Sequence, residues 1–170
     1  MINRARLEEL THVLTMMTRL GIAKEIFDMG FYLKRLSPRG ENGCGYAGCA
    51  IGHAAMHPPF QNEGFRPVTT FREDSSPTIG LFEGDMMLSC GTGHAARLFF
   101  GLNDAQYFFL FEQSFYGKGS GGSFSVPLTE DLCEEDYIWP SLVVKRIEFL
   151  LEHPELDWFD SENEMRHIPL

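Results

Sequence analysis

Apolar residues near the start of the chain recur every three or four positions, which is the spacing of one helix face. We therefore predict a helix over residues 4–20. Its apolar stripe consists of Leu7, Leu10, Leu14 and Met17. Gly21 interrupts the pattern, and the period resumes at Ile22, which predicts a second helix to about Leu36. Ser37-Pro38-Arg39-Gly40 is a sequence that stops a helix.

The rest of the chain alternates glycine-rich loops with further helical patterns. Additional helices are predicted near residues 49–56, 94–102, 104–115 and 140–153, with a loop at 39–48. Two short strands fit the segment 60–88, near Arg66–Phe71 and Thr78–Phe82. The predicted fold is mainly α, with α+β as the alternative. It is a compact helical domain over residues 1–170, with a two-stranded β element in 60–88, a flexible Gly/Ser loop at 117–123 and an acidic tail at 155–170.

Composition narrows the class of protein. A chain of 170 residues with 44% hydrophobic and 22% charged residues is long enough to bury a core. No apolar run approaches the length of a membrane-spanning helix, and residues 1–4 lack the apolar region of a signal peptide. These features predict a cytoplasmic protein with no membrane partner.

Charge is spread unevenly along the chain. The net charge is -10, and residues 130–170 hold twelve acidic and three basic residues. An acidic chain is a poor match for duplex nucleic acid, because nonspecific binding depends on neutralising phosphates. The acidic end is either a solvated face or a surface that engages a basic host protein.

One seven-residue phrase occurs twice. Cys49-Ala-Ile-Gly-His53-Ala-Ala and Cys90-Gly-Thr-Gly-His94-Ala-Ala share the pattern Cys-x-x-Gly-His-Ala-Ala. In the first interpretation each phrase begins a tightly packed helix, with cysteine and histidine held inside. In the second, Cys49, His53, Cys90 and His94 form a structural zinc site, since cysteine and histidine four apart share a helix face.

A third interpretation makes the helix starts a pocket for an anion. Glycines before the first phrase let a ligand approach closely, and unpaired N–H groups at a helix start favour phosphate or carboxylate. The loop at 117–123 would then supply one lysine as a flexible lid. The predicted ligand-binding residues are Cys44, Gly45, Tyr46, His53, His94 and Lys118. No catalytic signature surrounds the cysteines, so the chain is expected not to be an enzyme, and no catalytic residue is predicted.

Two segments resemble a family of small phage and bacterial proteins. Phe27-Asp28-Met29 and the later run from Cys44 to Ala54 are similar to a Phe-Asp-Met helix followed by Cys-Gly-Thr-x-x-Cys-x-x-Gly-Trp-Ala. Residues 96–111 are similar to a following Ala-x3-(Leu/Phe)-Gly-Leu segment. The resemblance covers about residues 5–115 and the last helix. It implies a phage or mobile-element origin and a small, mainly helical fold, without implying an activity.

This chain departs from the family pattern at two positions. The family's threonine is Tyr46 here, and its tryptophan is His53. A tryptophan at that position argues against an obligatory metal ligand. We therefore expect a non-enzymatic, counter-defence binding protein that sequesters a small nucleotide-like anion. The alternatives are an acidic inhibitor of a host protein and the zinc-stabilised module. The formation of a homo-oligomer by this chain is a further open alternative.

Overall fold

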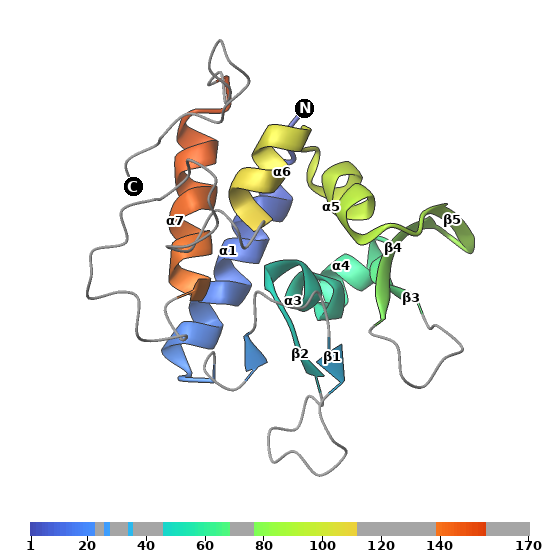
Figure 1. Ribbon diagram of the computed structural model, residues 1–170, viewed down its shortest axis with the longest axis horizontal. Helices are drawn as coiled ribbons and strands as arrows, with labels where there is room; N and C mark the ends of the chain where they lie inside the picture. The colour runs from blue at the N-terminus through green and yellow to red at the C-terminus, as the bar shows by residue number, and fades with distance from the viewer. Residues whose placement is uncertain (23–25, 28–33, 36–45, 69–76, 112–138, 156–170) are drawn as a thin grey trace, which may run out of the picture.

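The computed structural model describes residues 1–22, 26–27, 34–35, 46–68, 77–111 and 139–155. The described helices are α1 (Arg4–Arg19), α3 (Ala50–Met56), α4 (Pro58–Asn62), α5 (Thr92–Phe100), α6 (Asp104–Phe111) and α7 (Trp139–Glu152). The strands are β1 (Lys34–Arg35), β2 (Tyr46–Ala47), β3 (Phe65–Val68), β4 (Thr78–Glu83) and β5 (Met86–Ser89). Helices predominate, with a small sheet at one end (Figure 1), which agrees in outline with the mainly α prediction.

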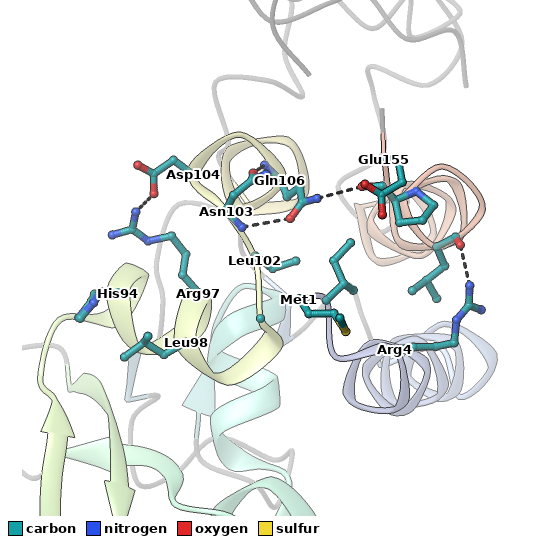
Figure 2. Close-up of a pocket in the computed structure, with 14 residues that line it drawn as sticks. Met1, Arg4, His94, Arg97, Leu98, Leu102, Asn103, Asp104, Gln106 and Glu155 are labelled. Carbon is teal, nitrogen blue, oxygen red and sulfur yellow. Dashed lines mark hydrogen bonds and ion pairs between the residues drawn. The ribbon is translucent and has the colours of Figure 1, made fainter. Parts of the chain in front are cut away.

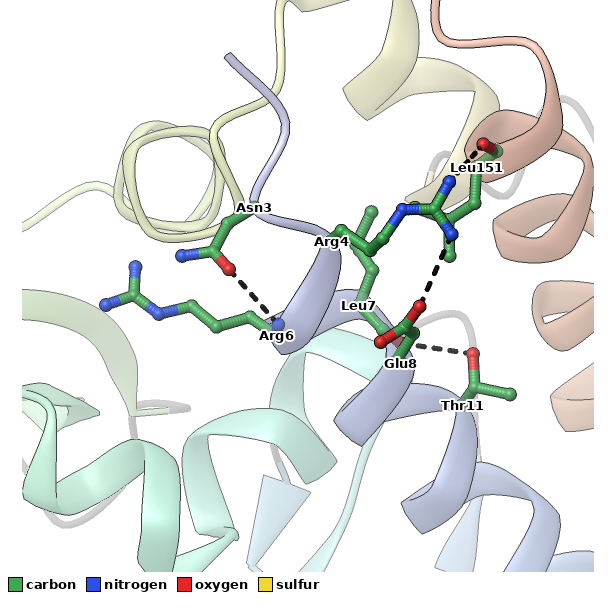
Figure 3. A network of polar contacts seen from close by, with 7 residues as sticks. All are labelled: Asn3, Arg4, Arg6, Leu7, Glu8, Thr11 and Leu151. Carbon is green, nitrogen blue, oxygen red and sulfur yellow. Dashed lines mark hydrogen bonds and ion pairs between the residues drawn. The ribbon is translucent and has the colours of Figure 1, made fainter.

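Helices α1 and α7 lie side by side and form the most regular part of the core (Figure 1). The four predicted apolar residues of α1 are all buried, as the helical period requires. The Asn3 side chain caps α1 by accepting a hydrogen bond of 3.2 Å from the Arg6 backbone N–H. Arg4 joins the two helices, because its guanidinium donates to the Leu151 carbonyl at 2.6 Å (Figure 3).

A cluster of phenylalanines fills the core between the helices and the sheet. Its members come from α4, β3 and α5, and they are Phe60, Phe65, Phe99 and Phe100. The rings of Phe65 and Phe99 stack at 4.5 Å, and Phe60 meets Phe99 edge to face at 5.2 Å. Such arrangements add to the stability that the buried apolar area provides. Pro58 and Pro59 follow the end of α3. They occupy the first turn of α4, where proline is well tolerated.

The sheet in the segment 60–88 has three antiparallel strands in the order β3-β4-β5, where we predicted two. The positions of β3 and β4 agree with the prediction within a few residues. The third strand follows the turn at Gly84, whose φ of 60° suits glycine. Sequence patterning missed β5 because Met86, Met87 and Leu88 are all exposed and therefore do not alternate.

The predicted second helix to about Leu36 is wrong at its end. Lys34–Arg35 form β1, which pairs antiparallel with Tyr46–Ala47, and Phe27 forms a parallel bridge with Gly48. Backbone pairing with residues 46–48 thus overrides the apolar period at these positions, and it also replaces part of the predicted loop at 39–48 with a strand. The extension of α6 to Phe115, the loop at 117–123 and the tail beyond Glu155 lie outside the described residues.

Within the described ranges, none of the helices combines the length and the apolar character that a bilayer crossing needs.

Candidate functional site

A groove of about 920 Å³ opens where the first turn of α1, the junction between α5 and α6, and the end of α7 meet (Figure 2). Three segments that are far apart in the sequence therefore build one site. The charged and histidine side chains that line it are Arg4, His94, Arg97, Asp104 and Glu155.

The junction between α5 and α6 is a sharp, well-capped turn. Gly101 ends α5 with a φ of 69°, and a side chain there would overlap the Met1 carbonyl oxygen. Asn103 and Gln106 then form a reciprocal cap, in which each side-chain oxygen accepts from the other backbone N–H at 2.9 and 3.0 Å. This turn brings the last turn of α5 against the first residue of α6.

Basic side chains lie at two ends of the groove. His94 and Arg97 are three residues apart on α5 and share one end, whereas Arg4 lies at the other end beside α7 (Figure 2). Met1 and Leu102 lie between them and give the middle of the groove an apolar surface (Figure 2). The groove therefore presents basic side chains at two ends and apolar side chains in the middle, with Asp104 and Glu155 also in its lining.

The basic groups already have partners. Arg97 forms an ion pair with Asp104 across the junction, and both side chains are partly or largely exposed. Arg4 forms an exposed ion pair with Glu8 at 3.3 Å, in addition to its bond to α7. Exposed ion pairs contribute little free energy, about 0–1 kcal/mol, so an incoming anion can replace a carboxylate at low cost.

His94 lines this groove, whereas His53 does not. The ring of His94 is exposed at the start of α5, and its Nδ1 lies 3.0 Å from the Ser89 hydroxyl. His53 is absent from the residues that line the groove. The two histidines of the repeated phrase therefore do not share this site.

His53 instead has a structural environment. Its Nε2 lies 2.8 Å from the Ile26 carbonyl, and its ring stacks on Phe27 with centroids 5.9 Å apart. Burial lowers the pKa of His53, while hydrogen bonds to the Ile26 and Gly48 carbonyls act in the opposite direction. The neutral ring is thus favoured, and its Nε2–H donates to Ile26. His53 therefore fits the first interpretation of the repeated phrase, in which the histidine packs inside at the start of a helix.

The zinc quartet is not assembled. Cys49 is buried just before α3, whereas Cys90 is exposed before α5. Among the described residues, which include all four proposed ligands, no three histidine, cysteine, aspartate or glutamate side chains gather closely enough to hold a metal. The zinc-site prediction for Cys49, His53, Cys90 and His94 is therefore wrong, because the two halves of the phrase face different surroundings.

Both copies of the phrase do begin helices. Cys49 is the N-cap of α3, and Gly91, one position later in its own copy, is the N-cap of α5. The paired alanines of each copy are buried, as close helix packing requires. Gly93 also needs its small size, because a Cβ there would lie 3.0 Å from the Tyr107 hydroxyl.

The remaining predicted ligand residues are Cys44, Gly45, Tyr46 and Lys118. Cys44, Gly45 and Lys118 lie outside the described residues, as do the acidic residues 134–136 of the host-protein alternative. Tyr46 belongs to β2.

Arg4, Arg97 and Asp104 were missed from the sequence. The only local signal was the spacing of His94 and Arg97, which puts both on one face of the helix predicted near residues 94–102. The contribution of Arg4 depends on α1 packing beside α7, and no local pattern reveals that contact. Comparison with known proteins adds no further information, since the chain matches no protein-family model, no curated protein and no solved structure.

Proposed function

We propose that this chain is a non-enzymatic binding protein that holds a small anionic, nucleotide-like ligand in the groove between α1, α5, α6 and α7. The observation that carries the proposal is the placement of basic side chains at both ends of one groove, with apolar side chains between them. A volume of about 920 Å³ lies within the range of small-molecule sites, roughly 300–1,000 Å³.

Arg97 is the expected anchor for the ligand. Its guanidinium presents several N–H donors in a planar fork, which matches the oxygens of phosphate or carboxylate. Asp104 pairs with that fork, and its exposed carboxylate is a weak competitor that an incoming anion displaces. At the opposite end, Arg4 would meet a second negative group, so a ligand with two separated anionic groups fits best.

Binding without catalysis is the simplest chemistry for these residues. The described residues that line the groove include no cysteine, serine or threonine that would act as a nucleophile. If the resemblance to phage proteins holds, the ligand would be a nucleotide signal in the cytoplasm of the host. Sequestering such a signal would lower its free concentration and so serve counter-defence.

Calorimetry on untagged protein tests the proposal against a panel of linear and cyclic mono- and dinucleotides. Arg97→Gln should weaken binding roughly 10-fold or more, since a hydrogen bond to a charged group contributes about 1.5–3 kcal/mol. Arg4→Gln should weaken the binding of ligands with two anionic groups more than that of ligands with one. Arg19→Gln is the matched control, because Arg19 is an exposed arginine at the far end of the same helix as Arg4.

Asp104→Asn gives a test in the opposite direction. Removing the competing carboxylate should raise the affinity roughly 2- to 5-fold, the equivalent of an exposed ion pair of up to about 1 kcal/mol. Absence of binding for the whole panel would refute the proposal. An equal loss of affinity in Arg19→Gln and Arg97→Gln would show that the groove is not the site.

A further inference from the structure

His94 is tied to a buried serine at the edge of the groove. Its Nδ1 lies 3.0 Å from the Ser89 hydroxyl, and Ser89 is only 7% exposed, although the histidine itself is exposed. An exposed histidine side chain ordinarily samples several rotamers. The bond to Ser89 restricts these rotamers, because breaking it would leave a buried hydroxyl without its partner.

Both ends of this hydrogen bond are fixed to the same strand. Ser89 is the last residue of β5 and pairs with Leu81 of β4. Thr92, the first residue of α5, accepts a 3.1 Å hydrogen bond through its Oγ1 from the backbone N–H of Ile79, which is also in β4. His94 follows two positions later. Strand β4 therefore holds the serine and the start of the histidine's helix in one frame.

The hydroxyl proton of Ser89 decides which nitrogen of the neutral His94 ring carries the proton. Within the described residues, His94 is the only hydrogen-bond partner of the Ser89 hydroxyl. If Nδ1–H donated to the serine, the hydroxyl proton would be buried without an acceptor, which is costly. The serine therefore donates to Nδ1, and the neutral ring carries its proton on Nε2. A protonated ring also has a proton on Nε2, so Nε2–H is a donor in both states.

This donor lies beside the expected anchor of the ligand. His94 and Arg97 share one face of α5 and line the same end of the groove (Figure 2). The planar fork of Arg97 matches two oxygens of an anion. A carboxylate has only two oxygens, whereas a terminal phosphoryl group has a third that can accept from Nε2–H. The two side chains together therefore favour a phosphoryl group over a carboxylate at this end.

We propose that Ser89 is a positioning residue, which orients His94 so that its Nε2–H donates to a phosphoryl group bound by Arg97. The inference rests on the proposed function, because it assigns the chemistry of one end of the same groove. Ser89 acts through His94, since the serine is buried and is absent from the residues that line the groove. A ring that is ordered before the ligand arrives reduces the entropy that binding costs.

Calorimetry of the full chain with inorganic pyrophosphate tests the inference. His94→Ala should weaken binding roughly 10-fold or more, because it removes a hydrogen bond to a charged group. Ser89→Ala should weaken it roughly 2- to 10-fold, the ratio that corresponds to immobilising one side chain on binding. His12→Ala is the matched control, because His12 is an exposed histidine of α1 that is absent from the groove lining. Succinate, a dicarboxylate, should bind more weakly than pyrophosphate.

A double-mutant cycle separates positioning from general destabilisation. In the His94→Ala background, Ser89→Ala should cause no further loss of affinity, because the serine acts only through the histidine. Ser89→Thr keeps the hydroxyl and should retain most of the affinity. Urea denaturation of each variant checks that it is folded under the conditions of the binding assay.

The position of the ring proton can be measured without any ligand. Proton–nitrogen NMR spectra of the isotope-labelled wild-type chain should place the proton of the neutral His94 ring on Nε2, with His94→Ala identifying the signal. A proton on Nδ1, unchanged affinity in His94→Ala, an equal loss from Ser89→Ala with and without His94, or succinate binding as tightly as pyrophosphate would each overturn the inference alone. A wild-type chain that binds neither pyrophosphate nor any nucleotide would refute the proposed function, and the inference with it.

Discussion

Replacing Gly64 with alanine should destabilise the sheet, because two separate costs meet at this position. Gly64 has a φ of 90°, a conformation that L side chains rarely adopt, and an alanine Cβ would overlap the Phe82 carbonyl oxygen. The Gly64 carbonyl accepts a 3.0 Å hydrogen bond from the Phe82 N–H, so the backbone cannot move away without weakening that bond. The positive φ costs about 1–2 kcal/mol, and the strained hydrogen bond about 1 kcal/mol more.

Gly84→Ala separates these costs. Gly84 has a φ of 60°, but a Cβ there would meet nothing within 4 Å. The Gly84→Ala variant should therefore lose only the free energy that the positive φ costs. The Gly64→Ala variant should lose at least about 1 kcal/mol more in the free energy of unfolding. Urea denaturation followed by circular dichroism measures both, with an unchanged m-value as the check on two-state unfolding. In thermal melts the difference corresponds to roughly 2–4 °C. Equal losses in the two variants would refute the reasoning.

Two further predictions concern His53 and the cap of α6. Because the folded state lowers the pKa of His53, the unfolded chain binds that proton more readily, and stability should fall as the pH drops below about 6.5 until it passes the folded pKa. Urea midpoints at about pH 7.5 and about pH 5.5 should differ more in wild type than in His53→Gln, and equal differences would contradict this. Asn103→Ala removes the acceptor for the Gln106 N–H and should cost about 1 kcal/mol in a urea titration, whereas the exposed Asn62→Ala should cost much less.

The helices were the elements most open to prediction from sequence. The stripe from Leu7 to Met17 places α1 almost residue by residue, because burial against one neighbour imposes a single period on the helix. The apolar period predicted a helix through Lys34–Arg35, but these residues form a strand that pairs with Tyr46–Ala47. This pairing depends on contacts between distant segments, which no local sequence pattern encodes. Strand β5 was missed because Met86, Met87 and Leu88 are all apolar and exposed, so the sequence shows no alternation of apolar and polar positions there.

The candidate site was predictable only in part. His94 was among the predicted ligand residues because it belongs to the repeated phrase, and the same phrase suggested a partnership with His53 that the fold does not make. Similar local sequence led to a half-buried, hydrogen-bonded ring in α3 and an exposed ring in α5, since burial depends on which neighbours cover the helix start. Arg4 and Arg97 are 93 positions apart and share a groove only through tertiary packing.

The position of Met1 has a practical consequence for any ligand screen. The Asn3 N–H donates to the Phe100 carbonyl at 2.8 Å, which fastens the first residues to the end of α5 and leaves the exposed Met1 in the lining of the groove. A purification tag fused ahead of Met1 would leave the protein through the proposed binding site and could occlude it. A negative result from such a fusion would then report steric blockage, so the screen should compare the fused protein with one from which the tag has been removed.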